Sequence, residues 1–175
     1  MNNLHIGGSV MKAAELIEKQ LPNVQYMYYL QHDFSFIEDV DHTALVSAMK
    51  QHDELNYVRF QYKAEGPRST HCGNATHILV NATKKYFWEE ASNFTLVTTS
   101  KYSDNNHFVK FRWYKELIAS LVMLRRPPEA PLMSRALDGC AKNQSLGLYL
   151  YPDIVLEHLD GRHSLAVNVT QQLGL

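Results

Sequence analysis

Cysteine is scarce in this sequence, and neither sign of charge is in excess. Two cysteines among 175 residues can form at most one disulfide bond, which excludes a fold held together mainly by disulfides. Seventeen Lys and Arg against eighteen Asp and Glu leave a formal net charge of −1. The chain therefore has no overall positive field to hold nucleic acid, and we expect no nucleic-acid partner.

Long apolar runs are also missing. A membrane-spanning helix needs roughly 18 to 20 apolar residues, and the richest stretch, residues 118–124, is short and flanked by charges. The segment after Met1 is neither basic nor followed by an apolar segment, so we expect no signal or membrane segment in this chain.

The composition that remains is that of a globular protein. Hydrophobic residues make up 45% of the chain, charged residues 20% and aromatic residues 11%. No internal repeat or low-complexity linker divides the sequence, and its length suits one medium domain. We therefore expect residues 1–175 to form a single domain.

The apolar pattern alternates between the spacing of helices and that of strands. Helical spacing predicts helices at residues 9–21 and after an Asp41 N-cap, and β-branched and aromatic residues predict strands at 24–30 and 56–62. This alternation favours a three-layer α/β fold in which helices flank a mostly parallel sheet.

The rest of the chain predicts further elements. They are strands at 76–80 and 94–99 around a helical turn near 84–90, a long helix from Ser103 or Asp104 to about residue 124, a short helix at 131–140, and strands at 147–151 and 154–158.

Nine histidines occur, and several stand beside acidic residues. Gln-His-Asp at 31–33 follows the strand predicted at 24–30, which we expect to be central. At the carboxyl end of such a strand a carboxylate can hold a divalent cation. The alternative is a plain turn with a solvated histidine.

Two more clusters admit both a structural and a functional interpretation. Residues 103–107, Ser-Asp-Asn-Asn-His, could cap a helix, or could supply a general base beside a histidine. Residues 157–163 contain an Asp-Gly turn, but His158 could bind a metal and Arg162 could clamp a phosphate.

Five Asn-x-Ser/Thr triplets are present, where random placement would give about one. They begin at Asn74, Asn81, Asn93, Asn143 and Asn168. This excess hints at a secretory lumen, although no signal segment is predicted here, so the localisation stays open.

Four blocks resemble a known enzyme family. They read QHDFSF, NYVRFQY, SDNNHF and GLYLYPDIVLEHLDGRH, and the first is preceded by the helix and strand of residues 7–30. Together they resemble family 2 glycosyltransferases with the GT-A fold, and in particular a eukaryotic, largely algal group. The resemblance covers about residues 7–163 and implies the C-terminal portion of a GT-A domain.

The resemblance also implies roles for individual residues. Asp33 matches the last Asp of the family's metal-binding Asp-x-Asp motif, with Gln31 in place of the first Asp. His158 matches the late histidine that completes the Mn²⁺ or Mg²⁺ site, and Asp104 matches the catalytic base of inverting members. The substrate-binding candidates are then His32, Asn106, His107 and Arg162. The implied reaction transfers a sugar from a nucleotide-sugar to the hydroxyl of a glycan or another acceptor.

Such a domain begins with a strand–helix–strand unit for the nucleotide base, and this sequence starts at the helix after it. We therefore expect a partial domain with one exposed edge of its central sheet. Two other functions stay open. One is a non-catalytic remnant that binds carbohydrate or metal, and the other is a metal-dependent hydrolase that uses Asp33, His107, His158 and His163.

Overall fold

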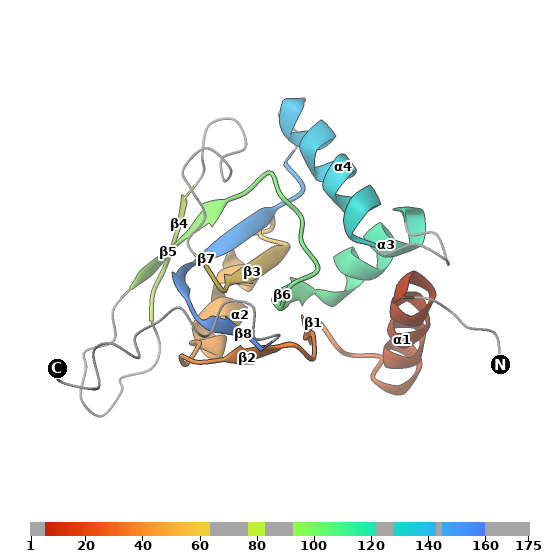
Figure 1. The fold of residues 1–175 in the computed structure, drawn as a ribbon, viewed down its shortest axis with the longest axis horizontal. Helices are drawn as coiled ribbons and strands as arrows, with labels where there is room; N and C mark the ends of the chain where they lie inside the picture. The colour runs from red at the N-terminus through yellow and green to blue at the C-terminus, as the bar shows by residue number, and fades with distance from the viewer. Residues whose placement is uncertain (1–5, 64–76, 83–92, 122–127, 143–144, 160–175) are drawn as a thin grey trace, which may run out of the picture.

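The computed structural model describes residues 6–63, 77–82, 93–121, 128–142 and 145–159. Both helices and strands occur along this part of the chain (Figure 1). In chain order they are α1 (Ile6–Gln20), β1 (Tyr26–Tyr29), β2 (Phe34–Phe36), α2 (His42–Gln51), β3 (Tyr57–Gln61), β4 (His77–Val80), β5 (Phe94–Thr98), β6 (His107–Lys110), α3 (Phe111–Leu121), α4 (Glu129–Ala141), β7 (Leu148–Ile154) and β8 (Leu156–His158).

The main sheet has six strands in the order β1-β6-β3-β7-β5-β4. Among its described pairings only β3–β7 is parallel, whereas β1–β6, β3–β6, β5–β7 and β4–β5 are antiparallel. The α/β class is confirmed, but the prediction of a mostly parallel sheet is wrong. Two antiparallel insertions explain the difference: β6 lies between β1 and β3, and β5 lies between β7 and β4.

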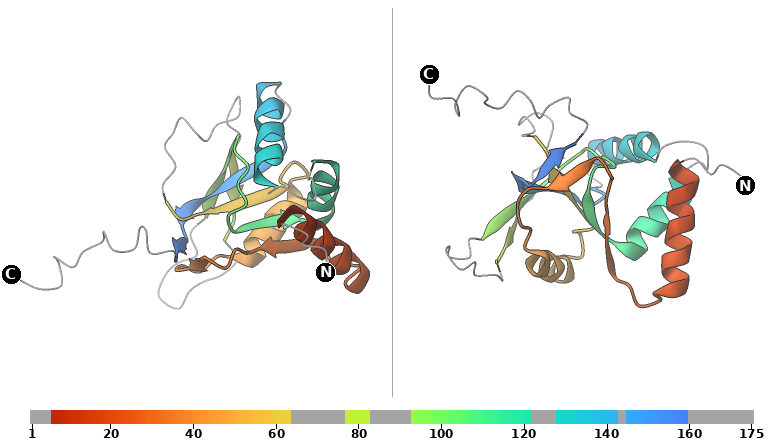
Figure 2. Two further views of the ribbon diagram at one scale, coloured as in Figure 1. Left: turned by 45° about the vertical axis from the view of Figure 1, so that its right-hand side comes forward. Right: turned by 60° about the horizontal axis from the view of Figure 1, so that its bottom comes forward.

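Helices cover both faces of this sheet, as the three-layer prediction requires (Figure 2). On one face α2 contributes Leu45 and Met49 to a core with Val58 and Phe60 of β3. On the other face α1, α3 and α4 form a second core around Tyr57. Successive β3 residues thus point to opposite cores, as the two-residue period of a strand demands.

Of the elements at residues 6–61, α1, β1, α2 and β3 follow the sequence pattern closely. Asp41 caps α2 as predicted, because its Oδ1 accepts a hydrogen bond of 2.9 Å from the backbone N–H of Ala44. One placement differs: β1 lies at the edge of the sheet and not at its centre.

The long helix predicted from Ser103 or Asp104 begins only at Phe111. The preceding residues His107–Lys110 form β6, and β6 leads directly into α3. Phe108, Phe111 and Tyr114 have helical spacing, but Phe108 belongs to a strand that pairs with β1 and β3. Tertiary pairing has overridden a local helical pattern here.

A small second sheet pairs β2 with β8. The sequence pattern did not predict β2, and the strand predicted at residues 154–158 is divided between the end of β7 and β8. No helix in the described residues is long and apolar enough to span a membrane.

Gly147 immediately precedes β7, at the point where the parallel pairing of β7 with β3 starts. Its φ is +73°, and a Cβ at this position would lie 2.0 Å from the carbonyl oxygen of Glu54. The Gly147 carbonyl accepts hydrogen bonds from the N–H groups of Asn56 and Tyr57, at 3.0 and 3.1 Å. A side chain would therefore push β7 away from the start of β3.

Replacing Gly147 with Ala should lower the free energy of unfolding by about 2 to 4 kcal/mol, through overpacking and an unfavourable φ. Urea unfolding measures the loss. Ser145→Ala is the milder comparison, because it removes only the hydroxyl that accepts a 3.1 Å hydrogen bond from Gly147 N–H and should cost about 1 kcal/mol. Equal stability of Gly147→Ala and the wild type would contradict the close contact.

Candidate functional site

The β2–β8 sheet brings Asp33 and His158 together. Phe34 pairs with His158 in its register, so Asp33 lies next to the end of β8. Asp33 Oδ2 is 3.2 Å from His158 Nε2, and the Asp33 carbonyl accepts a hydrogen bond of 2.7 Å from Leu159 N–H. The His158 ring packs 4.5 Å from the ring of Phe34. The Asp33 side chain is 35% exposed and the His158 side chain is 19% exposed, so this pair is held in place yet accessible.

The β1–β6 pairing brings the residue 31–33 and 103–107 segments together. Tyr29 pairs with His107, and beyond that pair the Asn106 Oδ1 accepts a hydrogen bond of 2.7 Å from Gln31 N–H. The Gln31 side chain hydrogen-bonds the carboxylate of Asp104. Segments more than seventy residues apart therefore meet beyond the end of β1, beside the Asp33–His158 pair.

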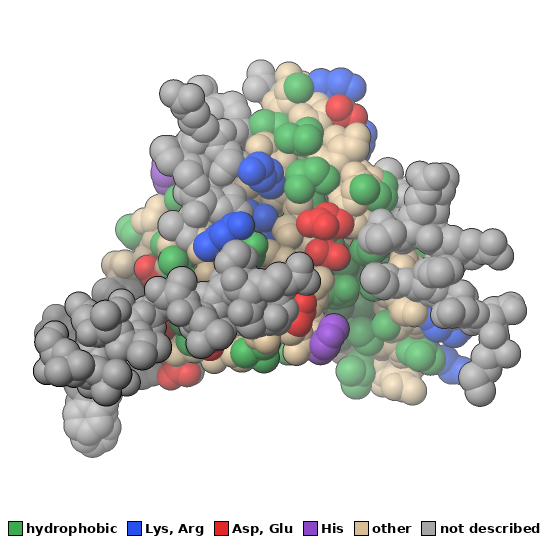
Figure 3. Space-filling view, in the orientation of Figure 1, with side chains coloured by type: hydrophobic (Ala, Val, Ile, Leu, Met, Phe, Trp, Pro, Cys, Tyr) green, Lys and Arg blue, Asp and Glu red, His purple; other side chains and the backbone are tan. Residues whose placement is uncertain are grey.

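Asp104 stands in an acidic environment. Burial raises its pKa above the ordinary value of 3.8, the carboxylates of Glu129 and Asp33 raise the pKa further, and the Gln31 hydrogen bond opposes the rise. Figure 3 shows acidic side chains near the middle of this face. A carboxylate with a raised pKa is a better proton acceptor than an ordinary one, provided that it is ionised.

His107 lies beneath this site in a cage of aromatic rings. Its ring stacks on Tyr29 with centroids 4.9 Å apart and lies 4.6 Å from Tyr57, with Tyr102 and Tyr114 completing the cage. Nδ1 donates a 2.7 Å hydrogen bond to the Asn105 carbonyl, whereas the buried Nε2 has no hydrogen-bond partner among the described residues. Burial lowers the pKa of His107 to about 3. The imidazole is therefore neutral at physiological pH.

The sequence predicts that His107 and Asn106 bind substrate, and the structure buries both side chains. His107 is 0% exposed and Asn106 is 1% exposed, so neither faces a ligand in this structure. Both instead hold the backbone near Asp104, through Asn105 and Gln31.

The remaining candidates are placed differently. His32 is exposed, whereas Arg162 and His163 lie outside the described residues. The described residues contain no group of three or more His, Cys, Asp or Glu side chains arranged to hold a metal ion. In particular, the buried His107 does not join Asp33 and His158 as the hydrolase alternative requires.

Sequence reasoning missed the contributions of Gln31 and Glu129. Glu129 is in the first turn of α4, where the helix dipole alone would explain an acidic residue. Only the tertiary fold brings it near Asp104, so no local signal could have identified it.

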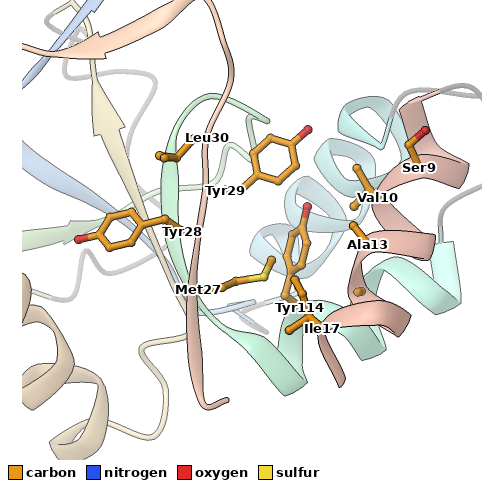
Figure 4. A pocket seen from close by; sticks show the side chains of 10 residues that line it. Ser9, Val10, Ala13, Ile17, Met27, Tyr28, Tyr29, Leu30 and Tyr114 are labelled. Carbon is orange, nitrogen blue, oxygen red and sulfur yellow. The ribbon is translucent and has the colours of Figure 1, made fainter. Parts of the chain in front are cut away.

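Grooves border β1, the edge strand beside the site. One of about 630 Å³ lies between β1 and α1, and Figure 4 shows Tyr29 and Tyr114 facing α1 across it. Another, of about 480 Å³, lies on the α2 side and includes His42 and Lys50, and a third measures about 290 Å³. Tyr28 lines all three. Among the described residues β1 pairs only with β6, so its outer edge is open.

No model of a known protein family matches the chain, and no curated protein matches it either. What the site does must therefore be inferred from its own residues.

The buried neutral His107 predicts a pH-dependent stability. The unfolded state takes up a proton near pH 6.5, but the folded state does so only near pH 3, so stability falls as the pH drops below 6.5. Between pH 7 and pH 5 this group alone should cost about 2 kcal/mol. His107→Phe should reduce the loss over that interval by a similar amount, as measured by urea unfolding at both pH values.

Tyr102→Phe serves as the matched control, because it alters the same cage without removing the imidazole. It should keep the wild-type pH dependence. If His107→Phe keeps it as well, the histidine is not the group responsible.

Asp104 predicts a pH dependence of stability with the opposite sign to that of His107. Because the folded state raises its pKa above the ordinary value, the ionised carboxylate destabilises the fold at neutral pH, and this cost disappears below about pH 4. Asp104→Asn should therefore unfold at a higher urea concentration at pH 7, with the gain vanishing in acid. Asp138→Asn, at an exposed position of α4, should show no such gain, and a destabilised Asp104→Asn would contradict the assignment.

Proposed function

We propose that this chain is a glycosyltransferase-like domain that transfers a sugar, with inversion, from a nucleotide-sugar to an acceptor hydroxyl. One observation carries the proposal. The blocks at residues 31–33, 103–107 and 157–158 converge on one site, with Asp33 Oδ2 3.2 Å from His158 Nε2 and Gln31 bound to Asp104. A purely structural origin of the three blocks would not require them to meet.

Asp33 and His158 would hold Mn²⁺ or Mg²⁺. Adjacent ligands of an octahedral ion with bonds of about 2.1 Å lie about 3 Å apart, which agrees with the 3.2 Å between the two donors. Such ions are commonly held by one or two protein groups together with substrate phosphates and water. The residues therefore fit a cation that is bound tightly only together with the nucleotide.

The charge of the site supports this assignment. The carboxylates of Asp33 and Glu129 are close enough to raise the pKa of Asp104. The three acidic groups together would therefore repel a diphosphate. When bound, the cation would neutralise the diphosphate and stabilise it as the leaving group. With the cation bound, the site would accept a nucleotide-sugar that it would otherwise repel.

Asp104 is the candidate base. The acceptor oxygen forms a bond to the anomeric carbon, the bond from that carbon to the diphosphate oxygen breaks, and the acceptor proton passes to the Asp104 carboxylate. The Gln31 side chain holds this carboxylate, and the Asn106 side chain in turn accepts a hydrogen bond from the backbone N–H of Gln31. The base is thus fixed by groups that do not themselves titrate.

The open edge of β1 fits the remaining part of the proposal. The family resemblance implies a strand–helix–strand unit that binds the nucleotide base beside the central sheet. β1 offers unpaired backbone groups on its outer side, within the described residues, and grooves lie on both of its faces. A further strand could therefore pair there, next to Asp33 and Asp104.

A binding function without turnover is the main alternative. The geometry of the Asp33–His158 pair serves it equally well, and only the role of Asp104 differs between the two.

The test combines nucleotide binding with turnover. Titration calorimetry of the chain with uridine and guanosine diphosphates should show binding that requires Mn²⁺ and that falls at least tenfold in Asp33→Asn and His158→Gln. Asp104→Asn should keep the binding but reduce Mn²⁺-dependent hydrolysis or transfer of the matching sugar nucleotide by about 10² to 10⁴-fold.

Asp138→Asn is the control and should match the wild type in both assays. Binding without turnover in the wild type would support the non-catalytic alternative. Full turnover in Asp104→Asn would exclude Asp104 as the base, and binding that is independent of both Mn²⁺ and Asp33 would exclude the cation site.

A further inference from the structure

The edge of the sheet opposite the candidate site is formed by β4. It is the last strand in the order, and within the described residues it pairs only with β5. Ile78 and Val80 face the core, whereas Leu79 is 62% exposed. A short apolar edge strand of this kind can pair with other chains unless something covers it.

Two asparagines flank this strand pair. Asn81 follows β4 and Asn93 precedes β5, and both are exposed. Val80 pairs with Phe94, so the next position of the register sets Asn81 opposite Asn93. Ala82 N–H donates a hydrogen bond of 3.2 Å to Asn93 Oδ1, which joins the end of β4 to the start of β5.

Both asparagines begin Asn-x-Thr triplets, which are acceptor sequences for N-linked glycans. Along β4 buried and exposed residues alternate, which sets Asn81 on the same face as Leu79. This face is directed away from the core that contains Ile78 and Val80. Bulky groups on these asparagines would therefore meet solvent and not the interior.

An independent feature points to the same environment. Cys140 in α4 is disulfide-bonded. Disulfide bonds persist mainly in oxidising compartments such as the endoplasmic reticulum lumen, where N-linked glycans are also attached.

We propose that Asn81 and Asn93 carry N-linked oligosaccharides that cover the exposed face of the β4 edge. The donor is a lipid-diphosphate-linked oligosaccharide. A bond forms between the asparagine Nδ2 and the anomeric carbon, the bond from that carbon to the phosphate oxygen breaks, the lipid diphosphate leaves, and the amide nitrogen loses one proton. This modification is independent of the function proposed above.

The test uses the full 175-residue chain, secreted from eukaryotic cells behind a cleavable signal. Gel mobility is compared before and after digestion with peptide-N-glycosidase. Asn81→Gln and Asn93→Gln should each remove one glycan. Thr95→Val should reproduce the loss seen in Asn93→Gln without touching the asparagine, whereas Thr95→Ser keeps the acceptor sequence and should keep the glycan. A double variant, Asn81→Gln with Asn93→Gln, that migrates like the wild type before digestion would overturn the proposal.

The covering role is tested by the size distribution of the secreted chains in light scattering. The double variant should form larger assemblies than the wild type, and adding Leu79→Lys should reverse this, because a charge on an edge strand opposes pairing. Identical size distributions for the double variant and the wild type would show that the glycans do not protect the edge.

Discussion

The insertion of β6 between β1 and β3 is the constraint on which the site depends. It pairs antiparallel with both neighbours, and its register sets Tyr29 opposite His107. That register fixes where the chain leaves β1 and where it enters β6, so Gln31 and Asp104 must lie close together. Sliding β6 by one residue would move Phe108 and Val109 into the wrong cores, so the packing of both faces also secures the site.

His107 stabilises the loop beside Asp104 at a cost to the stability of the protein. A buried imidazole nitrogen without a hydrogen-bond partner destabilises a protein, and within the described part of the chain Nε2 of His107 is such an atom. In return, Nδ1 holds the Asn105 carbonyl, one residue from Asp104. The ring also fills the space between four tyrosines. A phenylalanine could fill that space but could not hold the carbonyl, so the histidine is explained by the loop it positions.

Most helices and strands could be predicted from local sequence patterns, but the strands with which each strand pairs could not. The spacing of apolar residues in α1 and the Asp41 cap of α2 are local signals, and both correspond to the observed helices. The segment 107–110 fits a helical pattern, and only its pairing with β1 and β3 makes it a strand. The site divides in the same way: the acidic and histidine motifs are visible in the sequence, whereas the influence of Gln31 and Glu129 on the pKa of Asp104 arises only in the folded chain.

The two edges of the main sheet differ in a way that suits both proposals. β1 and β4 are five strand intervals apart in the sheet order, which at the usual spacing corresponds to about 24 Å. Glycans at Asn81 and Asn93 would extend from the β4 edge, so they would leave Asp33, Asp104 and the grooves beside β1 accessible. A covered β4 edge also limits unwanted pairing to one side of the molecule. The open edge of β1 would then be left for the strand–helix–strand unit of the proposed function, because a second strand-pairing surface would no longer compete with it.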